Sequence, residues 1–142
     1  GRWVPNPVEA MADIMNVVQN RATDVRWIRK GFKGACLQRW AFSCWEPRGG
    51  PDDPRDDDDL SENFEAVMLK AQQIMAGNDP GELLGALLAI ADRMTSGGCE
   101  DQLFGATHYY ADWMPSPPKW SFHKDAKLVA RRFGHLFFAG VP

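Results

Sequence analysis

The sequence predicts one α+β domain that is mainly helical and has a small β element near its C-terminus. The 142 residues suffice for a single domain. Apolar residues recur at helical spacing in three segments before residue 97, whereas short stretches typical of strands follow residue 104. The composition, with 44% hydrophobic and 25% charged residues, is that of a globular chain.

The charge and hydropathy of the chain exclude two classes of partner. The net charge is −3, whereas a nucleic-acid-binding domain usually carries a basic excess, so we expect no nucleic-acid partner. No apolar run approaches the roughly 18 residues that a membrane span needs, and no basic-then-apolar leader opens the chain. We therefore expect no membrane span and no visible signal peptide, and we interpret the start at Gly1-Arg2-Trp3 as a processed or truncated N-terminus.

The first helix is expected from about Pro7 to Ala22. Asn6 and Glu9 have the spacing of a capping box, in which the Glu9 carboxylate reaches back to the Asn6 amide, and proline is favoured at the first helical position. The apolar positions then follow the period of a helix: Val8, Met11, Ala12, Met15, Val18 and Ala22.

The middle of the chain is less regular. Residues 31–37 suggest a short helical turn, and the aromatic segment 38–45 reads as an extended stretch or a turn. Residues 46–59 form a loop with a run of aspartates, which repel one another and stay solvated. This run lacks the alternating ligands, glycine and terminal glutamate of a calcium loop, so we expect no metal there.

Two further helices are predicted before the β element. Asp59 and Glu62 have capping-box spacing, and the helix that follows ends at Gly77. Residues 82–94 are rich in leucine and are predicted to form the most buried helix, which Gly97-Gly98 ends.

The last third of the chain is predicted to form the β element. Residues 105–110 resemble a short strand after a glycine turn, and the prolines in 114–120 predict a rigid loop. Residues 127–132 fit a strand or a short helix, and residues 134–138 fit a closing strand.

The cysteines predict neither a metal site nor a redox pair. Cys36, Cys44 and Cys99 match no zinc spacing, and an odd number leaves at least one thiol unpaired. Whether Cys36 or Cys44 pairs with Cys99 stays open. We expect neither a cofactor nor a metal.

Four blocks of the chain resemble a known family. They are Val17-Val18-Gln19-Asn20-Arg21, Trp40-Ala41-Phe42-Ser43-Cys44-Trp45, Gly105-Ala106-Thr107-His108-Tyr109-Tyr110 and Gly134-His135-Leu136-Phe137-Phe138. In the same order and at similar spacing, they resemble the cell-wall hydrolase family typified by the spore cortex-lytic enzymes.

The resemblance implies a lysozyme-like fold resembling that of lytic transglycosylases. It also implies cleavage of peptidoglycan between N-acetylmuramic acid and N-acetylglucosamine, by hydrolysis or lytic transglycosylation. The implied partner is the glycan strand, which a monomer would cut at the bacterial cell wall. The short chain without a leader suggests a bacteriophage endolysin or a virion-associated lysin.

The resemblance places the catalytic glutamate just before Gly1, in the segment that precedes the first helix. Within the chain, Glu9 is the nearest candidate for the general acid, with helix capping as its alternative role. Glu46 is a second candidate, or else a loop carboxylate. His108 is the other catalytic candidate, or else a histidine whose hydrogen bonds are satisfied in the core, as we expect for His135.

Aromatic and hydroxyl side chains are the candidates for sugar binding, because a pyranose face stacks on aromatic rings and sugar hydroxyls need hydrogen-bond partners. If residues 107–109 form a strand, Thr107 and Tyr109 face one way and His108 the other. For each tryptophan, packing in the core is the alternative. The expected substrate-binding residues are Ser43, Trp45, Thr107, Tyr109, Trp113 and Trp120.

Two other functions compete with the enzyme. A wall-binding module would keep the aromatic surface and lack the acid. A structural phage component would use the same fold for assembly.

Overall fold

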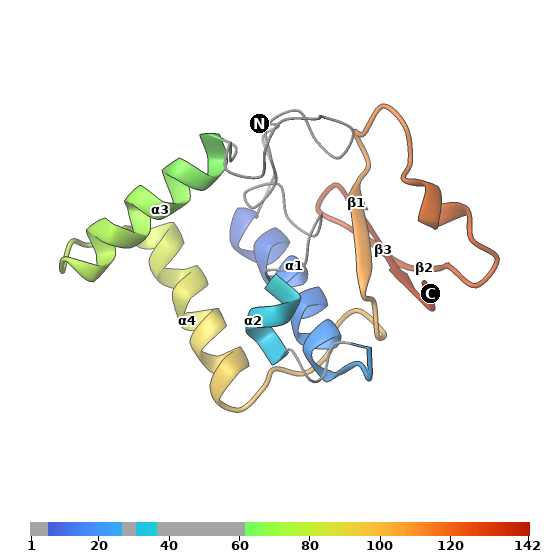
Figure 1. Ribbon diagram of the computed structural model, residues 1–142, viewed down its shortest axis with the longest axis horizontal. Helices are drawn as coiled ribbons and strands as arrows, with labels where there is room; N and C mark the ends of the chain where they lie inside the picture. Colours follow the sequence, from blue (N-terminus) through green and yellow to red (C-terminus); the bar gives the residue numbers. More distant parts are fainter. Residues whose placement is uncertain (1–5, 27–30, 37–61) are drawn as a thin grey trace.

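A central helix connects a helical part to a small sheet in the computed structural model, which describes residues 6–26, 31–36 and 62–142. Helix α1 (Pro7–Thr23) contacts α2 (Gly31–Cys36), α4 (Glu82–Ser96) and strand β1 (His108–Ala111). In Figure 1, α3 (Glu62–Met75) and α4 lie on one side of α1 and diverge from each other at an angle, and the sheet stands on the other side. The prediction of a mainly helical α+β domain is confirmed.

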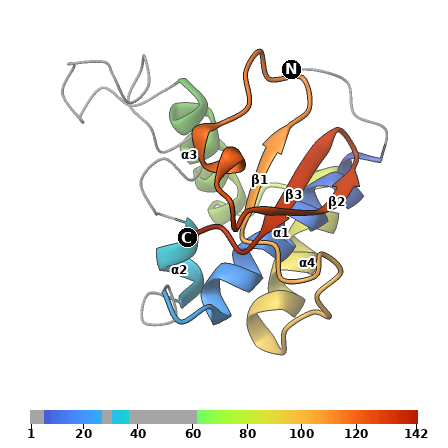
Figure 2. The ribbon, with the colours of Figure 1, turned by 90° about the vertical axis from the view of Figure 1, so that its right-hand side faces the viewer.

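The sheet has three antiparallel strands in the order β1-β3-β2, formed with β2 (Lys127–Arg132) and β3 (His135–Ala139). Residues 127–132 are therefore a strand rather than a helix. Phe133 and Gly134, at φ 48° and 75°, make the tight turn between β2 and β3. A short 3-10 turn, Lys119–Phe122, interrupts the proline-rich loop in front of β2. Figure 2 shows this turn beside the sheet.

Both faces of β3 are buried, because its side chains alternate between two apolar clusters. Phe137 faces α1 and packs with Val17, Leu103 and Ala106. Leu136 and Phe138 face away from α1 and pack with Val141, next to the partly buried ring of Trp120. A third cluster joins α1, α2 and α4 through Val18, Ala35 and Met94. The first and third clusters thus place α1 between the sheet on one side and helices α2 and α4 on the other.

Two predictions about the helices are wrong in detail. Asn6 makes no side-chain capping bond, because its backbone lies in the left-handed region at φ 57° and ψ 61° rather than in the extended conformation that capping uses. Helix α4 is not the most buried helix, since Leu83 and Leu88 are 48% and 43% exposed. Among the residues whose burial the structure describes, α1 has the most buried side chains, namely Ala10, Asp13, Val17, Val18, Gln19, Arg21 and Ala22.

Among the described residues, no helix has the length and hydropathy that a membrane span requires.

Candidate functional site

One face of α1 holds the loop that leads into the sheet. Gln19 donates from its amide nitrogen to the Cys99 carbonyl at 2.5 Å, and its amide oxygen accepts the Cys99 N–H at 2.8 Å. The next two residues of α1 also bind this segment. Asn20 donates to the Ala106 carbonyl at 2.9 Å, and Nε of the buried Arg21 donates to the Thr107 carbonyl at 2.6 Å. These bonds fix the loop against α1 just before β1 begins.

Asp101 organises the same loop. Its carboxylate accepts the N–H groups of Leu103 and Gly105 at 2.9 and 2.6 Å, and the side-chain amides of Asn16 and Asn20 at 3.0 and 3.2 Å. Burial alone would raise the pKa of Asp101, but these hydrogen bonds outweigh it and lower the pKa below its usual value. Asp101 is therefore an ionised structural anchor of the loop.

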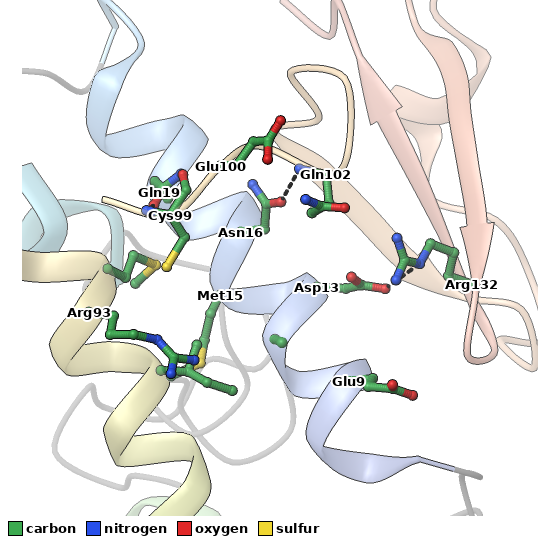
Figure 3. Close-up of a pocket in the computed structure, with 13 residues that line it drawn as sticks. Glu9, Asp13, Met15, Asn16, Gln19, Arg93, Cys99, Glu100, Gln102 and Arg132 are labelled. Carbon is green, nitrogen blue, oxygen red and sulfur yellow. Dashed lines mark hydrogen bonds and ion pairs between the residues drawn. The ribbon is translucent and has the colours of Figure 1, made fainter. Parts of the chain in front are cut away.

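A pocket of about 290 Å³ lies between α1, α4, this loop and the end of β2. In Figure 3, Glu9, Asp13 and Asn16 project from α1, Arg93 from α4 and Arg132 from β2. The pocket is lined by Glu9, Ala12, Asp13, Met15, Asn16, Gln19, Ile90, Arg93, Met94, Cys99, Glu100, Gln102 and Arg132.

Two carboxylates stand one helical turn apart at this pocket. Glu9 is exposed in the first turn of α1, whereas Asp13 is only 4% exposed and has an oxygen 3.0 Å from Nε of Arg132. Burial raises the pKa of Asp13, and the charge of Glu9 raises it further, although Arg132 and His135 act in the opposite direction. A ligand in the pocket can reach Glu9 directly, while Asp13 is held by the sheet.

Aromatic rings continue from Arg132 along the end of the sheet. The rings of Trp113 and His135 meet edge to face at a centroid distance of 5.2 Å, and Tyr109 lies 5.7 Å from His135. Trp113 stays 39% exposed. It lies so close to Gly134 that a Cβ there would be 2.7 Å from Cζ3 of the indole, which excludes larger residues at this turn. The site thus combines carboxylates with a fixed, partly exposed aromatic ring.

The predicted site residues Thr107, His108 and Trp120 lie apart from the pocket. Thr107 is buried, and its hydroxyl is 3.0 Å from Nδ1 of His108. The His108 ring packs on Trp120 at a centroid distance of 5.0 Å, and Trp120 also contacts Phe138. For the two predicted residues that lie within β1 the alternation is observed, since Tyr109 packs toward α1 whereas His108 packs on Trp120 at the opposite face of the sheet.

Glu9 and His108 do not meet in one site. His108 lies near Asp24, which follows the last turn of α1, whereas Glu9 is in the first turn. At about 1.5 Å per residue, these two ends of the helix are roughly 20 Å apart. Burial, and then the charges of Arg21 and Arg26, lower the pKa of His108 to about 4, so it is neutral at pH 7.

Three candidates, Ser43, Trp45 and Glu46, lie outside the residues that the structure describes. The sequence patterns did not indicate Asp13 as a site residue, nor its pairing with Arg132. The available signal was the spacing of Glu9 and Asp13, because residues four apart share one face of a helix. Within the described ranges, no group of three histidine, cysteine, aspartate or glutamate residues is arranged to hold a metal ion.

The family model described as Cell Wall Hydrolase matches residues 5–139. This match covers nearly the whole chain, so the chain belongs to the cell wall hydrolase family, whose substrate is the peptidoglycan of the bacterial cell wall. A search of curated proteins and a search of solved structures each found no match.

Proposed function

We propose that this cell wall hydrolase cleaves the glycan strand of peptidoglycan between N-acetylmuramic acid and N-acetylglucosamine. The family match over residues 5–139 carries the proposal. The arrangement of the described residues supports it, because an accessible carboxylate and a fixed aromatic ring lie on neighbouring parts of α1 and the sheet. Origin as a phage lysis protein stays a prediction.

Glu9 is our proposed general acid. It is an exposed carboxylate of the pocket, one helical turn from Asp13, which pairs with the sheet through Arg132, and a proton donor must come within hydrogen-bond distance of the glycosidic oxygen. The neighbouring Asp13 is nearly inaccessible and paired with Arg132, so it is better suited to orienting this end of the site. Trp113, with Tyr109 behind His135, supplies the surface on which a sugar ring stacks.

The proposed reaction is lytic transglycosylation. Glu9 gives its proton to the oxygen that leaves with N-acetylglucosamine, and the bond from that oxygen to C1 of N-acetylmuramic acid breaks. The 6-hydroxyl of N-acetylmuramic acid then bonds to C1 and returns its proton to the carboxylate. One carboxylate thus acts first as acid and then as base, so no second catalytic carboxylate is needed. Attack by water instead would give hydrolysis.

The test is digestion of purified sacculi, with the products identified by mass spectrometry. We expect anhydro-muropeptides from the wild type, because internal attack leaves a 1,6-anhydro ring, whereas hydrolysis leaves reducing ends. Glu9→Gln should lower the cleavage rate at least 100-fold, in keeping with the 10² to 10⁴ that general acid catalysis contributes. Trp113→Ala should mainly weaken sacculus binding.

Control variants distinguish the loss of a catalytic acid from a general effect of replacing a glutamate at the start of a helix. Glu82, also in the first turn of its helix, gives the matched variant Glu82→Gln, which should keep full activity. If Glu9→Gln stays fully active, Glu9 is not the acid, and the candidates become Glu100 of the same pocket, Glu46 and the glutamate that the resemblance places before Gly1. A wild type that binds sacculi without releasing any fragment would instead favour the wall-binding module.

A further inference from the structure

Beyond Glu9, the proposed general acid, the pocket beside α1 offers little that would bind a neutral sugar. Sugar hydroxyls need uncommitted donors and acceptors, yet the Gln19 amide is bound on both sides to Cys99. The Asn16 amide is likewise taken up by Asp101 and by the Gln102 N–H. No aromatic ring is among the described residues that line the pocket, so a pyranose finds no stacking surface there.

Of the remaining polar side chains at the pocket, Asp13 and Arg132 pair with each other and Gln102 offers one neutral amide, whereas Glu9, Arg93 and Glu100 are charged. Within the described part of the chain, neither the Arg93 guanidinium nor the Glu100 carboxylate makes a hydrogen bond or ion pair, and both side chains are exposed. In Figure 3 the two residues come from different segments, Arg93 from α4 and Glu100 from the loop after it. The pocket therefore offers one free positive and one free negative charge, in addition to Glu9.

The floor between these charges is apolar and adaptable. It is formed by Ala12 and Met15 of α1 and by Ile90 and Met94 of α4. Methionine side chains are flexible and polarizable, so they adjust to aliphatic ligands of irregular shape. A fitting ligand is aliphatic in its middle and carries both a carboxylate and an ammonium group.

We propose that this pocket binds the peptide stem of peptidoglycan. The inference rests on the proposed function, which brings the glycan to the adjoining aromatic surface. In the stem, a D-glutamyl residue carries a carboxylate, and a diamino acid carries an ammonium group. The stem carboxylate would pair with Arg93 and the ammonium with Glu100, while the aliphatic chain covers Met15 and Met94.

The first test compares two substrates. One is sacculus peptidoglycan with its stems, and the other is the same glycan stripped of stems by an amidase. We expect about a tenfold gain in wild-type kcat/KM for each of the two charge-assisted contacts, and so a preference of up to about 100-fold for the stem-bearing substrate. Arg93→Gln and Glu100→Gln should each reduce this preference about tenfold and leave cleavage of the stripped glycan unchanged.

Arg131→Gln is the matched control, because Arg131 is exposed and does not line the pocket. Equal rates of the wild type on both substrates, or equal losses on both in Arg93→Gln, would overturn the stem-binding proposal while leaving the proposed function intact. Failure to cleave either substrate would count against the proposed function instead.

Calorimetric titration tests the pocket without relying on cleavage. The probe is the tripeptide L-alanyl-γ-D-glutamyl-meso-diaminopimelate, and a form acetylated at its free side-chain amine serves as the comparison. We expect the tripeptide to bind the wild type, and both acetylation and Glu100→Gln to weaken binding about tenfold. If the wild type gives no heat of binding with the tripeptide, or if acetylation leaves binding unchanged, the proposed contacts are refuted.

Discussion

At the residue scale, His108 shows how packing sets the charge of a side chain. Its ring lies against Trp120 and next to the Thr107 hydroxyl, and the cations Arg21 and Arg26 are near it. The folded protein therefore favours the neutral imidazole, with a pKa of about 4 instead of 6.5. Such a histidine is poorly suited to accept a proton from substrate at neutral pH.

This shift predicts a specific loss of stability in acid. Between pH 6.5 and 4, the unfolded chain binds a proton at His108 that the folded protein does not, so the free energy of unfolding falls as the pH is lowered through this window. Urea unfolding of His108→Gln should show a shallower fall between pH 7 and 4.5 than the wild type. His123→Gln, at an exposed histidine, should keep the wild-type slope. An identical slope in all three proteins would contradict this origin of the acid sensitivity.

At the scale of elements, α1 illustrates what local sequence patterns reveal and what they omit. Its start at Pro7 and its end near Ala22 followed from proline and apolar spacing, because these signals act within a few residues. The buried positions of Gln19 and Arg21 did not follow, since their partners Cys99 and Thr107 are about eighty residues away in the chain. The same limit made leucine-rich α4 look more central than α1.

The contact of Gln19 with the loop has a measurable consequence. Gln19→Leu leaves both the N–H and the C=O of Cys99 without their side-chain partner. We expect the free energy of unfolding to fall by about 1–3 kcal/mol, the usual cost of such a loss. Gln72→Leu on α3, where the side chain is exposed, should change it by less than about 0.5 kcal/mol. If both variants lower the free energy of unfolding by similar amounts, the hydrogen bonds between Gln19 and Cys99 do not stabilise the fold as proposed.

At the scale of the whole molecule, the candidate site lies where the helical part meets the sheet. The four sequence blocks that resemble the cell-wall hydrolase family predicted the family and the β1 and β3 segments. They did not predict which residues would meet at this junction. Glu9 and Trp113 come together with Arg132 because β1 runs back along α1, so the end of the strand lies near the start of the helix. This arrangement depends on how β1 packs along α1 in the folded protein. The same packing places Thr107 and His108 near the C-terminal end of α1.

The ion pair between Asp13 and Arg132 is the direct link between α1 and the sheet at this junction. Removing the cation in Arg132→Gln leaves a buried carboxylate without its counter-charge, which we expect to lower the free energy of unfolding by about 1–3 kcal/mol at pH 8. The raised pKa of Asp13 sets the sign of the pH effect. A folded protein that binds this proton more readily than the unfolded chain gains stability as the pH falls.

The loss in Arg132→Gln, measured by urea unfolding against the wild type, should therefore be smaller at pH 5 than at pH 8. Arg131→Gln is the control, because its exposed side chain is on the neighbouring position of β2 and makes no pair with Asp13. In the double variant Asp13→Asn/Arg132→Gln, the buried charge is gone, so most of the difference between the two pH values should disappear. A loss of equal size at both pH values would mean that the guanidinium acts through packing of its aliphatic chain rather than through the charge of Asp13.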